Sequence, residues 1–168
     1  TDTATLVINP VNDAPFMPGV ALGSTNEDTT WTMAVSTLAG YSSDVDAGAL
    51  KGLAIVGIDN TNGTWQYTLN GTDWFNIGAV ATNNALLLAA DATSAFRFVP
   101  NANWNGTTGM LQYKAWDQTS GTAGTYADAS VSGGTTAFSG TSGSTVQVTA
   151  VNDAPNAVTR LVDMGMEA

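Results

Sequence analysis

Apolar and polar residues alternate along most of this chain, and a period of two is typical of half-buried β-strands. In one run, Trp31, Met33 and Val35 fall on one side, while small and polar residues fall on the other. Further runs lie at 53–58, 65–69, 86–89, 96–98 and 110–116. Asn70-Gly71 predicts a tight hairpin, and no run favours a helix. Roughly seven to nine short strands with frequent turns predict an all-β fold, an antiparallel β-sandwich with Greek-key connections.

The segment 118–143 differs from these runs, because it is rich in Gly, Ser and Thr and has few large apolar side chains. This composition fits either a flexible loop or a decorated hairpin. In both cases, we expect Tyr126 and Phe138 to anchor the segment to the rest of the domain.

One five-residue sequence occurs twice. Val11–Pro15 reads Val-Asn-Asp-Ala-Pro, and Val151–Pro155 repeats it letter for letter. The residues before each copy alternate as a strand does. An internal repeat of this kind indicates an array of units, although two similar loops in one domain would give the same letters. We therefore expect three parts, namely the last strand and linker of a preceding unit at 1–15, one full unit at 16–155, and the start of the next unit at 156–168.

Composition and charge exclude several kinds of catalytic site, metal site and binding partner. The chain has 14 acidic and 4 basic residues, a formal net charge of −10, and no His or Cys. It therefore has no thiol or imidazole for nucleophilic catalysis or for zinc, and its charge disfavours nucleic acid and anionic membranes. No apolar run is long enough to span a bilayer, and the lack of an initiator Met or signal-peptide pattern is expected of an internal piece of a longer chain.

The acidic residues are mostly Asp, and they gather in predicted loops and linkers. Asp44 and Asp46 are two residues apart in a loop, a spacing that lets both carboxylates face one hard cation. Calcium takes oxygen ligands, and carboxylates, side-chain amides and backbone carbonyls supply them. A solvated turn would explain Asp44 and Asp46 alone. Calcium becomes the better interpretation once they are taken together with Asp117 at a strand end and with the acids of the two linkers.

Several motifs together resemble one known family, the cadherin-like tandem repeats of giant bacterial surface adhesins of the secreted RTX type. The resemblance covers essentially the whole unit, 11–155. The motifs that carry it are the Val-Asn-Asp-Ala-Pro linker, Asn26–Thr29, Ser43–Asp46, Phe98–Gly106 and Ala115–Asp117. The resemblance implies an Ig/cadherin-like sandwich.

The resemblance also implies Ca²⁺ at the junctions between consecutive units. Carried over residue by residue, the N-terminal junction site comprises Asn12, Asp13, Asp44, Asp46 and Asp117. The C-terminal junction site comprises Glu27, Asp28, Asn152 and Asp153, and it would need further ligands from the next unit. One departure is that the family's mid-domain Glu is absent, since Leu88–Asp91 stands where it is expected and Asp91 is a poor substitute.

These features predict a calcium-binding extender repeat, not an enzyme, at the extracellular surface of a bacterium. Calcium would stiffen the junctions, so that the stalk projects a distal binding domain for adhesion and biofilm formation. The expected partners are the neighbouring repeats of the same chain, with neither nucleic acid nor direct membrane insertion.

The alternative is a module of the same adhesin that binds a glycan or peptide through segment 118–143 and exposed Trp side chains. Trp31, Trp65 and Trp116 lie at alternating strand positions and are expected in the core, whereas Trp74 and Trp104 lie beside turns and are expected to be more exposed.

Overall fold

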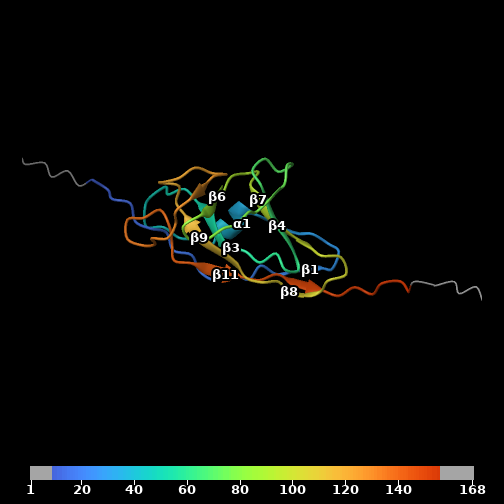
Figure 1. The fold of residues 1–168 in the computed structure, drawn as a ribbon. Coiled ribbons are helices and arrows are strands. Elements are labelled where there is room, and N and C mark those ends of the chain that lie inside the picture. The colour runs from blue at the N-terminus through green and yellow to red at the C-terminus, as the bar shows by residue number, and fades with distance from the viewer. Residues whose placement is uncertain (1–8, 156–168) are drawn as a thin grey trace, which may run out of the picture.

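The computed structural model describes residues 9–155 and shows an elongated β-sandwich (Figure 1). The predicted all-β antiparallel sandwich is confirmed, but the predicted number of strands is wrong, because the described residues form twelve. Six of these are only two or three residues long, too short for an alternating pattern to reveal. The elements are β1 (Ser24–Asn26), β2 (Trp31–Ala34), α1 (Val35–Ala39), β3 (Gly52–Gly57), β4 (Gly63–Thr68), β5 (Phe75–Asn76), β6 (Ala85–Ala89), β7 (Ala95–Pro100), β8 (Gly106–Thr107), β9 (Leu111–Trp116), β10 (Tyr126–Ala127), β11 (Ser142–Ser144) and β12 (Gln147–Thr149).

Two antiparallel sheets form the sandwich. One has five strands in the order β10-β6-β3-β9-β11, and the other has four in the order β2-β7-β4-β5. Only β4 and β5 are neighbours both in the chain and in a sheet, so most connections cross between the sheets or skip a strand. A third sheet, β1-β12-β8, extends one end of the domain, and its β1–β12 pair is parallel.

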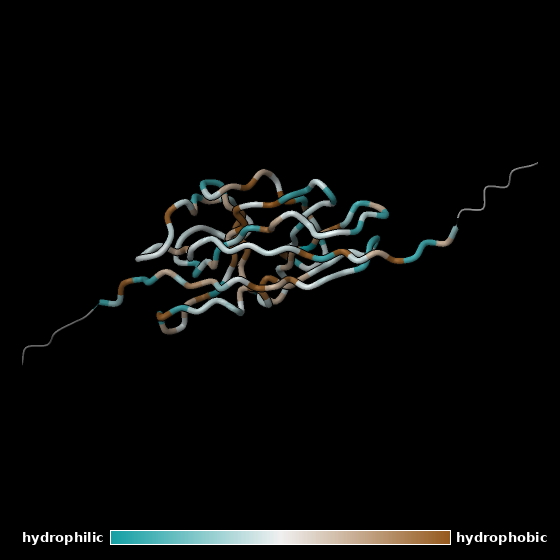
Figure 2. Tube along the Cα trace, turned by 90° about the horizontal axis from the view of Figure 1, so that it is seen from below, coloured by the Kyte–Doolittle hydropathy of each residue, from teal (hydrophilic) through white to brown (hydrophobic). Residues whose placement is uncertain are grey.

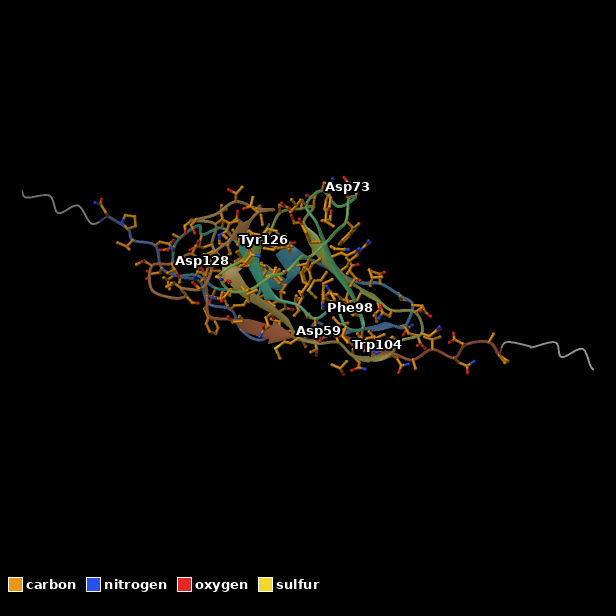
Figure 3. All side chains as sticks on the ribbon, in the orientation of Figure 1. Asp59, Asp73, Phe98, Trp104, Tyr126 and Asp128 are labelled. Carbon is orange, nitrogen blue, oxygen red and sulfur yellow. The ribbon has the colours of Figure 1, made fainter. Side chains whose placement is uncertain are left out.

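The main core fills the space between the two large sheets. Its centre is a group of aromatic rings in which Trp65 contacts Phe98 with ring centroids 5.1 Å apart and Trp31 at 6.1 Å. As predicted, Trp31, Trp65 and Trp116 are buried. Trp74 and Trp104 are half-buried, and Trp104 packs edge-on against Phe98 (Figure 3).

Segment 118–143 covers the outer face of the five-stranded sheet. Ala129, Ala137 and Phe138 pack there on outward-facing residues of the sheet, among them Leu87 and Trp116. The backbone of β10 pairs with β6, and Phe138 pairs with Trp116. Phe138 is therefore a buried anchor, whereas the Tyr126 side chain is 43% exposed and is held through its backbone. With this extra layer, both faces of the five-stranded sheet are buried, the inner one by the main core and the outer one by segment 118–143.

Two local predictions were wrong. The strand expected to run through Val35 ends at Ala34, because Val35 begins a five-residue helix whose Val35, Leu38 and Ala39 side chains are buried in the core. The hairpin expected at Asn70-Gly71 exists as β4–β5, but six residues connect its strands. Within residues 9–155, the helix is too short to cross a membrane.

The described chain enters and leaves the domain at opposite ends (Figures 1 and 2). Residues 9–15 lie beyond one end of the five-stranded sheet, and residues 150–155 extend past β1 and β8 at the other. Most of the strand expected before the first linker and all of 156–168 fall outside the described residues.

Candidate cation sites at the two ends of the domain

At the entry end, the linker is docked onto the domain by its own polar groups. The Asn12 side-chain amide donates to the Asp117 carboxylate at 2.9 Å, and the Ala14 backbone N–H donates to the Gly134 carbonyl at 2.7 Å. Phe16 then pairs with Ser43 as an isolated β-bridge. The linker is thus tied both to the loop that holds the Asp-x-Asp sequence and to segment 118–143.

Asp117 is the most buried acidic residue of this end, with 2% of its surface exposed. It follows β9 directly, and one carboxylate oxygen accepts from the Thr119 N–H at 2.8 Å and from the Thr119 hydroxyl at 2.6 Å. The other oxygen accepts from Asn12. Thr119 was missed by sequence reasoning, although an Asp followed two residues later by Thr is a recognisable turn signal.

The Asp-x-Asp loop forms a chain of hydrogen bonds that leads back to the linker. The Asp13 N–H donates to the Asp46 carboxylate at 2.8 Å, and the Asp46 N–H donates to the Asp44 carboxylate at 2.9 Å. Asp13 therefore contributes its backbone here, and its side chain is exposed. The second oxygen of Asp44 is buried and has no hydrogen-bond partner among residues 9–155. A buried oxygen without a partner is costly, so a water or a cation at this atom would stabilise the loop.

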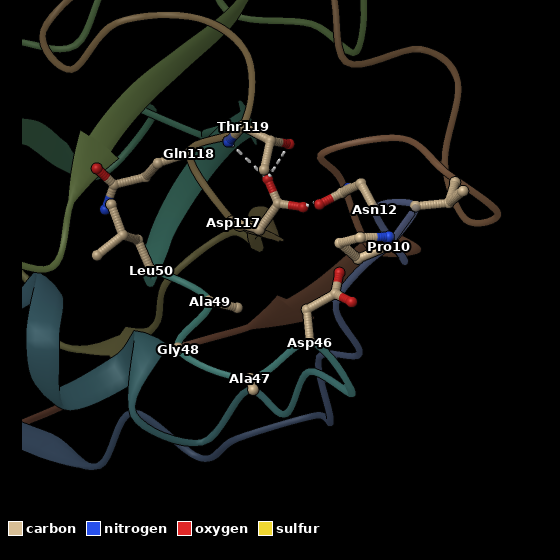
Figure 4. Close-up of a pocket in the computed structure, with 11 residues that line it drawn as sticks. Pro10, Asn12, Asp46, Ala47, Gly48, Ala49, Leu50, Asp117, Gln118 and Thr119 are labelled. Carbon is tan, nitrogen blue, oxygen red and sulfur yellow. Dashed lines mark hydrogen bonds between the residues drawn. The ribbon is translucent and has the colours of Figure 1, made fainter. Parts of the chain in front are cut away.

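A hollow of about 570 Å³ lies between the linker, the loop after Asp46 and the residues that follow β9 (Figure 4). The linker at 10–12, the loop at 46–50 and residues 117–119 line it, and the Asp46 and Asp117 side chains border it. The described residues bring no three acidic side chains together in one cation-binding group. The donors are nonetheless all oxygens, which suits Ca²⁺ and not a transition metal. The oxygens of this end could supply part of a calcium shell, and a bound ion would need further ligands.

At the exit end, Glu27 holds the departing chain. Its side chain is 7% exposed, and its carboxylate accepts from the Val151 N–H at 2.6 Å and from the Asn105 amide at 3.3 Å. Asp28 has a positive φ of 58° and accepts from the Asn103 N–H at 2.9 Å. Asn103 and Asn105 were not predicted as site residues, although they lie in a motif that carries the family resemblance.

The structure does not join the remaining exit residues to this pair. Asn152 and Asp153 are exposed, and the Asn152 amide donates only to the neighbouring Asp153 carbonyl among the described residues. The predicted C-terminal set is therefore divided between a buried Glu27 that holds the start of the linker and two exposed linker residues that make no described hydrogen bond to it.

Comparison with known proteins adds no family at this point, since no family model matches the chain and no curated protein or solved structure is significantly similar to it.

Proposed function

We propose that this chain is a calcium-binding extender repeat of a bacterial surface adhesin. The observation that carries the proposal is at the entry end. There the Asp13 N–H of the duplicated linker donates to Asp46, the Asp46 N–H donates to Asp44, and the second Asp44 oxygen is buried with no hydrogen-bond partner among residues 9–155. A cation at this oxygen would join the linker to the domain that follows it.

The shape of the domain supports a role in extension. Entry and exit lie at opposite ends, so units joined through such linkers would follow one another in a line (Figure 2). Short linkers leave domains free to rotate by default, because small interfaces hold them weakly. Acidic side chains gathered at a junction repel each other and splay it further.

Calcium would supply the charge that cancels this repulsion. At the entry end, Asn12, Asp13, Asp44, Asp46 and Asp117 would hold it, and at the exit end Glu27, Asp28, Asn152 and Asp153 would do so with the following unit. The Val151 N–H donates to Glu27 and holds the start of the exit linker at its own domain, so a following unit would begin close to that carboxylate.

Such a stalk works outside the cell, where calcium is abundant. We therefore propose the surface of a bacterium as its location, adhesion and biofilm formation as its role, and neighbouring repeats of the same chain as its partners.

Calorimetric titration of calcium into the 168-residue chain tests the ligand assignment. Asp44→Asn keeps the shape of the side chain but removes the charge, so it should remove one bound calcium. Asp59→Asn is the matched control, because Asp59 loses the same charge in an exposed turn where its carboxylate accepts from Thr61 and from neither linker. Equal calcium stoichiometry in wild type and Asp44→Asn would refute the assignment.

A second candidate function is recognition of a glycan or peptide by segment 118–143. The observation that favours it is a second hollow of about 440 Å³, lined largely by hydroxyl-bearing residues and Asp128 of that segment. Binding on a glycan array that is unchanged in Asp44→Asn and in chelator would favour this function over a pure extender.

A further inference from the structure

The two outer faces of the sandwich differ in what covers them. Segment 118–143 buries the outer face of the five-stranded sheet. Most outward side chains of the four-stranded sheet β2-β7-β4-β5 are instead exposed or half-buried, including Thr32, Gln66, Asn76 and Arg97. This second face therefore presents polar side chains.

A fixed network crosses this open face. Strand register places Gln66 between Arg97 on β7 and Asn76 on β5. The Arg97 Nε–H donates to the Gln66 carbonyl oxygen at 2.7 Å, and the Gln66 amide donates to the Asn76 carbonyl oxygen at 2.7 Å. The Arg97 guanidinium also lies 4.0 Å from the centroid of the Trp74 ring. The ring and the amide hold the guanidinium in one orientation, so it is preorganised.

Arg97 is unusual among the basic residues of this acidic chain. Lys51 donates to the carbonyls of Gly40 and Ser42, and Lys114 is buried and donates to the Ala129 carbonyl and the Ser132 hydroxyl. Arg160 lies outside the described residues. The contacts of the Arg97 guanidinium within residues 9–155 are with neutral groups, and only its Nε–H donates a hydrogen bond there. Its terminal N–H groups therefore remain for a ligand.

We propose that this face is a binding site for a carboxylate-bearing sugar, such as a uronic acid unit of a polysaccharide. The outward side chains of the face carry one charge, the Arg97 cation, which complements an anion. The planar N–H fork of Arg97 matches the two oxygens of a carboxylate. The neighbouring Gln66 and Asn76 amides suit sugar hydroxyls, and the indole of Trp74 suits the C–H face of a sugar ring.

The geometry favours a sugar over an acidic peptide. A peptide adds to a sheet by pairing with an edge strand, but the edge strand nearest this network, β5, is only two residues long. The two hollows at the entry end lie on other elements than this face. The net charge of −10 repels dense polyanions, so we expect Arg97 to bind a single carboxylate of the sugar chain.

NMR titration of the labelled 168-residue chain with trigalacturonate tests this site. The matched probe is the fully methyl-esterified trisaccharide, which keeps the rings but has no charge. Chelator is present throughout, so that calcium neither bridges the sugar to the acidic ends nor links this result to the proposed extender role. The resonances followed are the Arg97 Nε–H and the Trp74 indole N–H.

The free acid should shift both resonances, and the ester should bind at least about tenfold more weakly, because a hydrogen bond to a charged group is worth more than a tenfold change in affinity. Arg97→Gln should lose binding, and Arg97→Lys should weaken it because Lys lacks the planar fork. Lys51→Gln removes the same charge elsewhere and should leave binding unchanged.

Three results would overturn the proposal. Equal weakening in Arg97→Gln and Lys51→Gln would show that overall charge, not this site, attracts the sugar. Equal affinity for acid and ester would exclude recognition of the carboxylate, and equal affinity for a short acidic peptide would exclude a sugar site. Folding of each variant is checked by its thermal unfolding curve, and Arg97→Lys serves as the conservative variant if Arg97→Gln unfolds.

Discussion

The two copies of Val-Asn-Asp-Ala-Pro have the same sequence and different surroundings. In the entry copy, Asn12 binds Asp117, the Asp13 N–H binds Asp46, and Pro15 is buried. In the exit copy, Val151–Pro155 is exposed throughout, and the contact that ties it to the domain is the bond from Val151 to Glu27. The entry copy is thus held by several bonds to the domain that follows it, and the exit copy by one bond to the domain that precedes it. Substitutions in each copy, or in the residue that binds it, can break or sharpen this comparison.

The largest difference is expected between Asp117→Ala and Asp153→Ala. Loss of the buried Asp117 carboxylate removes the acceptor of three hydrogen bonds, and we expect it to lower the free energy of unfolding by about 3 kcal/mol. Asp153→Ala should have almost no effect, because the side chain is exposed. Urea unfolding in chelator measures both, and similar values for the two variants would contradict the difference between the copies.

A smaller difference is expected between Asn12→Ala and Asn152→Ala. Asn12→Ala removes the bond to Asp117 and should lower the free energy of unfolding by about 1 kcal/mol. Asn152→Ala removes only a bond to the adjacent residue and should be neutral. Here the same residue is changed in the same five-residue sequence, so any residue-specific effect on the unfolded chain cancels.

Amide hydrogen exchange should separate the copies without any substitution. The N–H groups of Asp13 and Ala14 are bonded to Asp46 and Gly134, and they should exchange more slowly than those of Asp153 and Ala154. Fast exchange of Ala14, at the rate of Ala154, would mean that the entry linker is not docked in solution.

The smallest effect concerns pH and a carboxylate outside both linkers. Burial raises the pKa of Asp91, but hydrogen bonds from Ser94 and Thr93 outweigh it and hold the pKa below its ordinary value of 3.8. Such a group contributes stability above pH 3.8 that is lost as the pH falls through the lowered pKa. The free energy of unfolding should therefore fall slightly less between pH 5 and pH 2 in Asp91→Asn than in the wild type, with a difference below about 1 kcal/mol. Urea midpoints measured across this pH range give the comparison. An unchanged pH profile would show that this turn does not contribute.

The sequence predicted the parts of the fold that depend on burial alternating along a strand. The runs at Trp65 and at Phe96 and Phe98 became β4 and β7, with their aromatic side chains in the core. It could not predict β5 or β10, because a strand of two residues is too short to show an alternation of apolar and polar residues. The sequence named Phe138 as an anchor of segment 118–143 but left open whether the segment is a loop or a hairpin, since its other buried anchors are Ala, whose small side chains give little signal.

The candidate site likewise has residues that the sequence could predict and residues that it could not. The acidic turn at Asp44 and the strand-end Asp117 stand near the linker, because strand ends gather at one end of a sandwich. The roles of Gly134, Thr135 and Thr136, whose carbonyls receive the linker, could not be predicted, because backbone groups carry no sequence signal. A long-range docking contact of this kind becomes visible only in three dimensions.

Calcium-dependent thermal unfolding tests the central claim most directly. A ligand that binds only the folded state raises the melting temperature, and a calcium concentration about one hundred times the dissociation constant is worth roughly 2.7 kcal/mol. We expect the melting temperature of the 168-residue chain to rise in calcium relative to chelator, and the rise to be much smaller in Asp44→Asn but retained in Asp153→Asn. Superimposable melting curves in calcium and in chelator would contradict the account.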